Sequence, residues 1–139
     1  MNRLLAPKAC RILGAVLCIS MVFAAEPLSA RSLEAVKMAG SYIVGIQIDR
    51  NPPIIGKNHI EIEIKDASGK IITDARVLVN YYMPPMPRMA PMNYKTDTKY
   101  RNGKYITDMH FIMEGPWVIA IKINLAGRNS TVKFNVDAK

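Results

Sequence analysis

The chain has 139 residues and carries 19 Lys and Arg against 11 Asp and Glu, a formal net charge of +8. This length predicts a single domain together with a targeting segment or tail. The two cysteines, Cys10 and Cys18, both precede residue 31, so the rest of the chain has no thiolate for nucleophilic catalysis or for a zinc site.

Residues 1–30 have the layout of a secretory signal segment. A basic start precedes the apolar run 12–25, which is shorter than the roughly 20 residues that a stable membrane-spanning helix needs. Small residues follow, and we expect cleavage after Ala25 or Ala30. The protein is therefore predicted to be exported to the periplasm, or to stay anchored in the membrane if the segment is retained. Export argues against nucleic acid as a partner.

Residues 31–40 are predicted to be a linker or a short helical turn, and residues 41–139 to form one domain. Six later segments alternate apolar with polar residues, the pattern of a strand with one buried face. Their apolar faces lie at 42–48, 60–64, 77–81, 105–113, 117–123 and 132–136. A seventh strand is expected around 94–100. Turn residues separate these segments, and no helical periodicity follows Gly40. An all-β, immunoglobulin-like antiparallel β-sandwich of about seven strands is predicted, with Trp117 as a core anchor.

The segment 83–92, MPPMPRMAPM, is the most unusual part of the chain. Proline removes the amide proton that a helix or a central strand needs, and it favours polyproline II, which repeats every three residues. The methionines have this same spacing of three, at Met83, Met86, Met89 and Met92. We therefore expect their side chains to project from one edge of the segment.

Such a row of thioethers has two interpretations. Thioether sulfur is a soft ligand that suits Cu(I) and loses no proton on binding, so the row predicts a Cu(I) site. Methionine also fills irregular apolar gaps, so the row could instead pack on the core or contact a protein partner.

A basic stretch at 94–104 is a weaker candidate for a surface that binds anionic lipid or a polyanion. That surface would consist of Lys95, Lys99, Arg101 and Lys104. The favoured alternative is a solvated hairpin that turns at Asn102-Gly103.

Histidines and catalytic motifs add little. His110 is a candidate accessory ligand to copper, but its parity points it away from Met109 and Met113, and a surface histidine near Asp108 is the favoured interpretation. His59 lies on a solvated strand face. The chain has no nucleophile elbow, phosphate-binding loop or HExxH motif, so we predict that it is not an enzyme.

Two stretches, YYMPPMPRMAPM at 81–92 and GKYITDMHFIMEGPWVIAIKI at 103–123, together resemble the YtkA-like domain family. Members of this family are exported or membrane-tethered immunoglobulin-like sandwiches with a methionine-proline segment after a central strand. The resemblance covers residues 40–136. It implies an extracytoplasmic accessory role beside heavy-metal or copper efflux systems or cytochrome-oxidase assembly systems, with soft-metal handling. The chain departs from the pattern at Arg88, where relatives commonly carry glycine and where a positive charge would oppose an incoming cation.

We therefore predict a non-catalytic extracytoplasmic accessory domain that contacts or hands on a soft metal ion such as Cu(I) through the 83–92 edge. Its partner would be an envelope protein of a metal-efflux or oxidase-assembly system. The alternative is a structural interaction module of an envelope complex that binds no metal.

Overall fold

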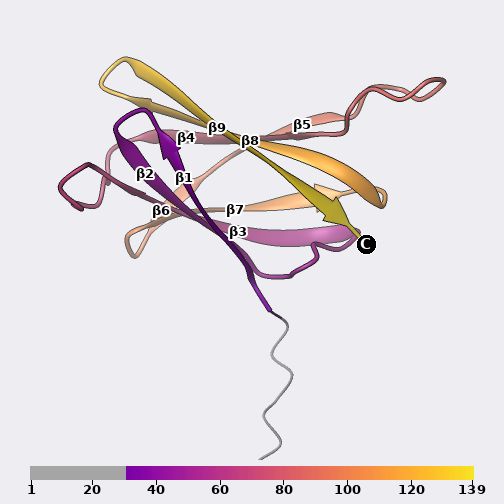
Figure 1. Ribbon diagram of the computed structural model, residues 1–139, viewed down its shortest axis with the longest axis horizontal. Helices are drawn as coiled ribbons and strands as arrows, with labels where there is room; N and C mark the ends of the chain where they lie inside the picture. The colour runs from indigo at the N-terminus through magenta and orange to yellow at the C-terminus, as the bar shows by residue number, and fades with distance from the viewer. Residues whose placement is uncertain (1–30) are drawn as a thin grey trace, which may run out of the picture.

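The computed structural model describes residues 31–139, which form two antiparallel β-sheets packed face to face (Figure 1). The predicted signal segment and its cleavage sites lie outside the described residues. The strands are β1 (Leu33–Ala39), β2 (Tyr42–Ile48), β3 (Gly56–Lys65), β4 (Arg76–Tyr82), β5 (Asn93–Asp97), β6 (Lys99–Arg101), β7 (Lys104–Phe111), β8 (Gly115–Leu125) and β9 (Arg128–Ala138). Within residues 31–139, no helix is long and apolar enough to cross a membrane.

The two sheets differ in size and in strand order. Sheet A has five strands in the order β1-β2-β3-β7-β6, and sheet B has four in the order β5-β4-β8-β9. The chain passes from one sheet to the other after β3, after β5 and after β7. The predicted antiparallel β-sandwich is confirmed, with nine strands in the described residues rather than about seven.

The prediction of a linker at residues 31–40 is wrong. Strand β1 pairs with β2 along its whole length, from Leu33 opposite Ile48 to Ala39 opposite Tyr42. Its apolar residues do not follow the usual pattern, because Val36 and Met38 point outward and are 72% and 64% exposed. Leu33, Ala35 and Ala39 still pack against the core, so this edge strand combines backbone pairing with β2 and an incomplete buried face.

The expected strand at 94–100 is in fact two strands that belong to different sheets. Strand β5 pairs with β4 in sheet B, and β6 pairs with β7 in sheet A. The change of sheet occurs at Thr98, whose amide and hydroxyl both donate to the carbonyl oxygen of Val77, at 3.2 and 2.9 Å. These two bonds hold the chain at the point where it leaves sheet B.

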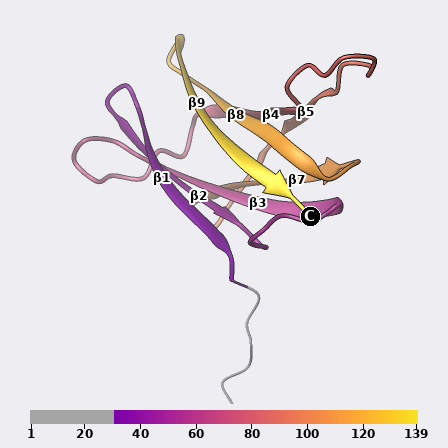
Figure 2. The same ribbon diagram turned by 45° about the vertical axis from the view of Figure 1, so that its right-hand side comes forward.

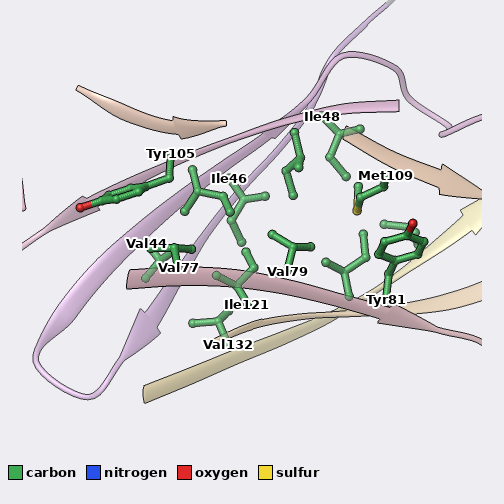
Figure 3. Close-up of a cluster of buried hydrophobic side chains, with 14 of the residues drawn as sticks. Val44, Ile46, Ile48, Val77, Val79, Tyr81, Tyr105, Met109, Ile121 and Val132 are labelled. Atoms are coloured by element: carbon green, nitrogen blue, oxygen red, sulfur yellow. The ribbon is translucent and has the colours of Figure 1, made fainter. Parts of the chain in front are cut away.

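The core lies between the sheets and consists of the predicted apolar faces (Figure 3). Val44 and Met109 reach it from sheet A, and Val79 and Ile121 reach it from sheet B. Trp117 is fully buried, as predicted, and its indole N–H donates to the carbonyl oxygen of Met113 at 3.0 Å. Each large apolar side chain buried in this way contributes about 1.5–3 kcal/mol to stability.

Tyr105 joins the loop before β4 to strand β7. Its hydroxyl donates to the carbonyl oxygen of Ile72 at 2.9 Å and accepts from the amide of Ala75 at 3.0 Å. Burial raises the pKa of this phenol above its ordinary value. The hydroxyl of Tyr105 thus provides the hydrogen-bond partner for two backbone groups of this loop.

Candidate functional site

Residues 83–92, which we call the methionine hairpin, connect β4 to β5. The hairpin extends beyond the ends of the strands, at the upper right of Figure 1, and Figure 2 shows the same projection. At its base, the amide of Met83 donates to the carbonyl oxygen of Met92 at 3.1 Å. At its tip, the amide of Met89 donates to the carbonyl oxygen of Met86 at 3.3 Å. The chain therefore reverses direction between Met86 and Met89.

The turn at the tip has Pro87 and Arg88 as its two central residues. Arg88 has a φ of 66°, in the left-handed region. Proline first and a positive φ second are the features of a type II turn, which favours glycine at the second position. This gives a conformational reason for glycine at this position, and Arg88 adopts a backbone conformation that L side chains seldom take.

The prediction of four methionines along one continuous polyproline edge is wrong. Strands β4 and β5 are antiparallel neighbours, so the segment between them must reverse its direction. The spacing of three is preserved within each limb, and the turn itself also spans three residues. The methionines consequently form two pairs across the hairpin: a base pair, Met83 and Met92, and a tip pair, Met86 and Met89.

The two pairs differ in their exposure to solvent. Met83 is 6% exposed and belongs to the hydrophobic core, and Met92 is half-buried against that core. Met86 and Met89 are 36% and 40% exposed. The hairpin therefore carries one shielded and one accessible pair of thioethers, in place of the expected exposed row.

All four methionines nevertheless line one hollow of about 230 Å³ within the hairpin. The other lining residues are Tyr82, Pro84, Pro85, Ala90, Pro91 and Asn93. Arg88 is not among them, so its charge belongs to the exposed turn rather than to the wall of the hollow. Four of its ten lining residues carry a thioether sulfur, the ligand type that suits a soft ion. Within residues 31–139, no group of three or more His, Cys, Asp or Glu residues could hold a metal ion.

A cluster of aromatic rings supports the base of the hairpin. Tyr81 stacks on Tyr94 with ring centroids 5.5 Å apart, and it meets Phe111 edge-on at 5.8 Å and Trp117 at 6.1 Å. Tyr81 precedes the hairpin on β4, and Tyr94 follows it on β5. Sequence reasoning did not identify this pairing, although both tyrosines flank the methionine segment and could have pointed to it.

The side chain of Met83 also lies close to Gly115. A Cβ atom added at Gly115 would lie 3.2 Å from the terminal methyl carbon of Met83, which is tighter than an ordinary van der Waals contact. Gly115 also has a φ of 115°. The base of the hairpin is therefore held by the core, whereas its tip is joined only through the two limbs.

His110 does not line the hollow. It is exposed on the outer face of sheet A, and its amide donates to the hydroxyl of Tyr81 at 3.3 Å. The parity argument that pointed its side chain away from the buried Met109 is confirmed. We leave His110 out of the candidate donor set on this ground.

His59 and Asp108 lie opposite each other on the same outer face of sheet A. The Nδ1 atom of His59 is 2.8 Å from the carboxylate of Asp108, and Lys57 is 2.9 Å from that carboxylate. The hydrogen bond to His59, followed by that to Lys57, lowers the pKa of the Asp108 carboxyl below its ordinary value. These contacts form a solvated ion-pair network, in agreement with the predicted solvated face.

The predicted basic surface is divided between two faces of the molecule. Lys95 pairs with Asn80 on the outer side of sheet B, whereas the other three cations extend from sheet A. Lys104 is also bound to Glu61, at 2.6 Å, and this hydrogen bond raises the pKa of the lysine. The four cations therefore do not lie on one sheet, and lipid or polyanion binding by them stays a prediction. The alternative hairpin is confirmed, with φ of 50° at Asn102 and 82° at Gly103, as in a type I′ turn.

The fold and the site together define an antiparallel β-sandwich with a methionine- and proline-rich hairpin between two neighbouring strands. The model of the YtkA-like family matches residues 39–122, and the chain belongs to this family. The crystal structure of the soluble domain of PmoD from a Methylocystis species is similar to this chain, with a TM-score of 0.54 and 13% sequence identity. That likeness covers 75% of this chain and 96% of the PmoD chain, and at this identity it concerns the fold alone. Comparison with curated proteins gave no significant match.

Proposed function

We propose that this protein is a non-catalytic extracytoplasmic accessory domain that binds a soft metal ion such as Cu(I) in the methionine hairpin. In this function it passes the ion to, or receives it from, an envelope partner in a metal-efflux or oxidase-assembly system. The signal-like segment 1–30 and the resemblance to exported YtkA-like domains support the location.

One observation carries the proposal: the four methionines, although they come from two limbs, line the same hollow. Thioethers bind without losing a proton, so the site would be available over a wide pH range. Soft sulfur favours Cu(I) over hard cations such as Mg²⁺ or Ca²⁺. When bound, the ion would be held by the thioethers, because the lining of the hollow includes no carboxylate or imidazole.

The two methionine pairs would serve different steps. The tip pair, Met86 and Met89, is accessible and would make the first contact with an incoming ion. The base pair, Met83 and Met92, is shielded by the core and would slow the release of the ion. Arg88 on the turn would repel free cations, which favours delivery by a protein partner over capture from solution.

The test is a Cu(I) titration of the purified protein under a competing chelator and without oxygen. The comparison variant has leucine at Met83, Met86, Met89 and Met92, a change that nearly conserves side-chain volume. Met38→Leu is the matched control, because it removes an exposed methionine on β1 and leaves the hollow intact. We expect the fourfold variant to lose binding while it stays folded, and Met38→Leu to bind as the parent does. Equal, weak uptake by the parent and the fourfold variant would eliminate metal binding.

A second candidate function is an interaction module that binds no metal. The observation in its favour is that the exposed Met86 and Met89 lie among prolines in an apolar loop that projects from the sandwich. Flexible methionine side chains on such a loop can adapt to a partner surface. Loss of Cu(I) binding in a folded fourfold variant would reject this interaction-only function.

A further inference from the structure

We propose that the tip pair, Met86 and Met89, is a modification site for small oxidants such as hydrogen peroxide. The two thioethers become sulfoxides before those of the base pair, Met83 and Met92. In each step peroxide transfers one oxygen atom to sulfur, sulfur loses two electrons, and the rest of the peroxide leaves as water. The pattern of modification is independent of metal, but its consequence for metal binding rests on the function proposed above.

Exposure separates the two pairs. Oxidation of methionine follows the access of the oxidant to sulfur. Met86 and Met89 are 36% and 40% exposed, whereas Met83 is 6% exposed. Met92 is intermediate, because it packs half-buried against the core. The tip residues thus present about six times the exposed fraction of Met83, and we expect them to react faster.

The fold tolerates a sulfoxide at the tip and not at the base. A sulfoxide oxygen is polar, and burying it without a hydrogen-bond donor is costly. At Met83 the new oxygen would enter a packed site, where even a methyl group added at Gly115 would come within 3.2 Å of the side chain. At Met86 and Met89 the oxygen reaches water. Oxidation of the tip pair therefore changes the chemistry of the hollow and leaves the sandwich intact.

The change bears directly on a soft ion. A sulfoxide presents a hard oxygen in place of soft sulfur and is a poor ligand for Cu(I). With Met86 and Met89 oxidised, two of the four thioethers around the hollow remain. Methionine sulfoxide can be reduced again enzymatically, so the modification is reversible. The hairpin thus acts as a switch that releases its ion when oxidant rises.

The first experiment maps oxidation without metal. The purified protein is exposed to increasing hydrogen peroxide, quenched and analysed by peptide mass mapping. We expect oxygen to appear at Met86 and Met89 at least about sixfold faster than at Met83, the ratio of their exposed fractions. Met38, 64% exposed on β1, serves as the reference for an unhindered methionine. Circular dichroism and the urea midpoint should be unchanged when both tip residues are oxidised.

The second experiment measures Cu(I) affinity anaerobically after the oxidant has been removed. The protein used carries Met38→Leu, so that oxidation at β1 does not contribute. We expect oxidation of the tip pair to weaken Cu(I) binding by about tenfold or more, since even the loss of an outer-shell partner costs 10- to 100-fold. The double variant Met86→Gln/Met89→Gln, which places amide oxygens at the tip, should bind as weakly as the oxidised protein. Met86→Leu/Met89→Leu should show weak binding that no longer changes with oxidant.

The possible outcomes distinguish the separate claims. Equal oxidation rates at all four methionines would overturn the modification site, and unfolding upon tip oxidation would overturn the switch. Selective oxidation with unchanged Cu(I) affinity would overturn the switch and leave the proposed function standing. Absence of Cu(I) binding before oxidation would overturn the proposed function together with its switch, while the oxidation map would still decide the modification site.

Discussion

Replacing single methionines of the hairpin by alanine should separate the base from the tip by stability alone. Met83 is 6% exposed and belongs to the core, so Met83→Ala removes buried atoms and leaves a cavity. Methionine-to-alanine changes in cores cost about 2–5 kcal/mol. Because Met83 lies at the end of the core and keeps some exposure, we expect a loss of about 2–3 kcal/mol. Met89→Ala, at a residue 40% exposed, should change stability by less than about 0.5 kcal/mol.

The assay is urea unfolding followed by the fluorescence of Trp117. This residue is the single tryptophan of the chain and is fully buried, so its emission reports the opening of the core. In a thermal scan, a domain of this size should lose about 4 °C per kcal/mol, which places Met83→Ala about 10 °C below the parent protein.

Met83→Leu is the control for volume, since a swap of similar size should cost less than about 1.5 kcal/mol. If Met83→Ala and Met89→Ala lowered the midpoint equally, the division of the hairpin into a shielded and an accessible pair would be refuted.

Three further changes test other parts of the structure. Gly115→Ala should lower the stability by about 1–3 kcal/mol, because a φ of 115° does not suit an L side chain. Gly45→Ala is the control in the same urea assay: its added methyl group meets only ordinary contacts at 3.8 Å, so it should be nearly neutral. Asp108→Asn should remove a stabilisation that is complete above the ordinary carboxyl pKa of about 3.9 and is lost as the pH falls through the lowered pKa of the folded state. The urea midpoint of the variant should therefore lie below that of the parent at pH 6, and the difference should disappear toward pH 2. A difference that does not depend on pH would contradict this. Tyr105→Phe leaves the carbonyl of Ile72 and the amide of Ala75 without their partner and should lower the stability by about 1–3 kcal/mol. Hydrogen exchange in the loop before β4 should become faster. Unchanged exchange would argue that the two hydrogen bonds of Tyr105 do not hold this loop.

The strands with a buried face could be predicted from the sequence because alternation directly reflects burial. In β3, the isoleucines at 60, 62 and 64 are fully buried and their neighbours are not, so the period of two is clear. In strand β1 the sequence does not alternate clearly with burial. Lys37 lies on the same side of the strand as Ala35 and Ala39, while the apolar Val36 and Met38 face solvent. The burial of Ala39 and the partial burial of Leu33 and Ala35, together with backbone pairing to β2, became visible only in the structure.

The arrangement of the methionine hairpin also could not be predicted from the sequence. Proline favours extended backbone within each limb, but the reversal at Pro87-Arg88 depends on the pairing of β4 with β5. Strand β5, with the sequence NYKTD, is polar and only partly buried, so it gives little sign of being a partner of β4. The soft donors could therefore be named from the sequence, whereas their arrangement around a common hollow required the tertiary structure.

The prolines of the methionine hairpin also bear on how well the protein survives proteolysis. A projecting loop tip is ordinarily where a protease first cuts a folded protein. Many proteases grip their substrate as an extended strand through its backbone amides, and four of the ten hairpin residues have no amide proton to offer. The one basic residue of the loop, Arg88, lies inside a tight turn rather than in an extended stretch. The hairpin can thus project far from the sandwich and still resist digestion, without a disulfide to protect it.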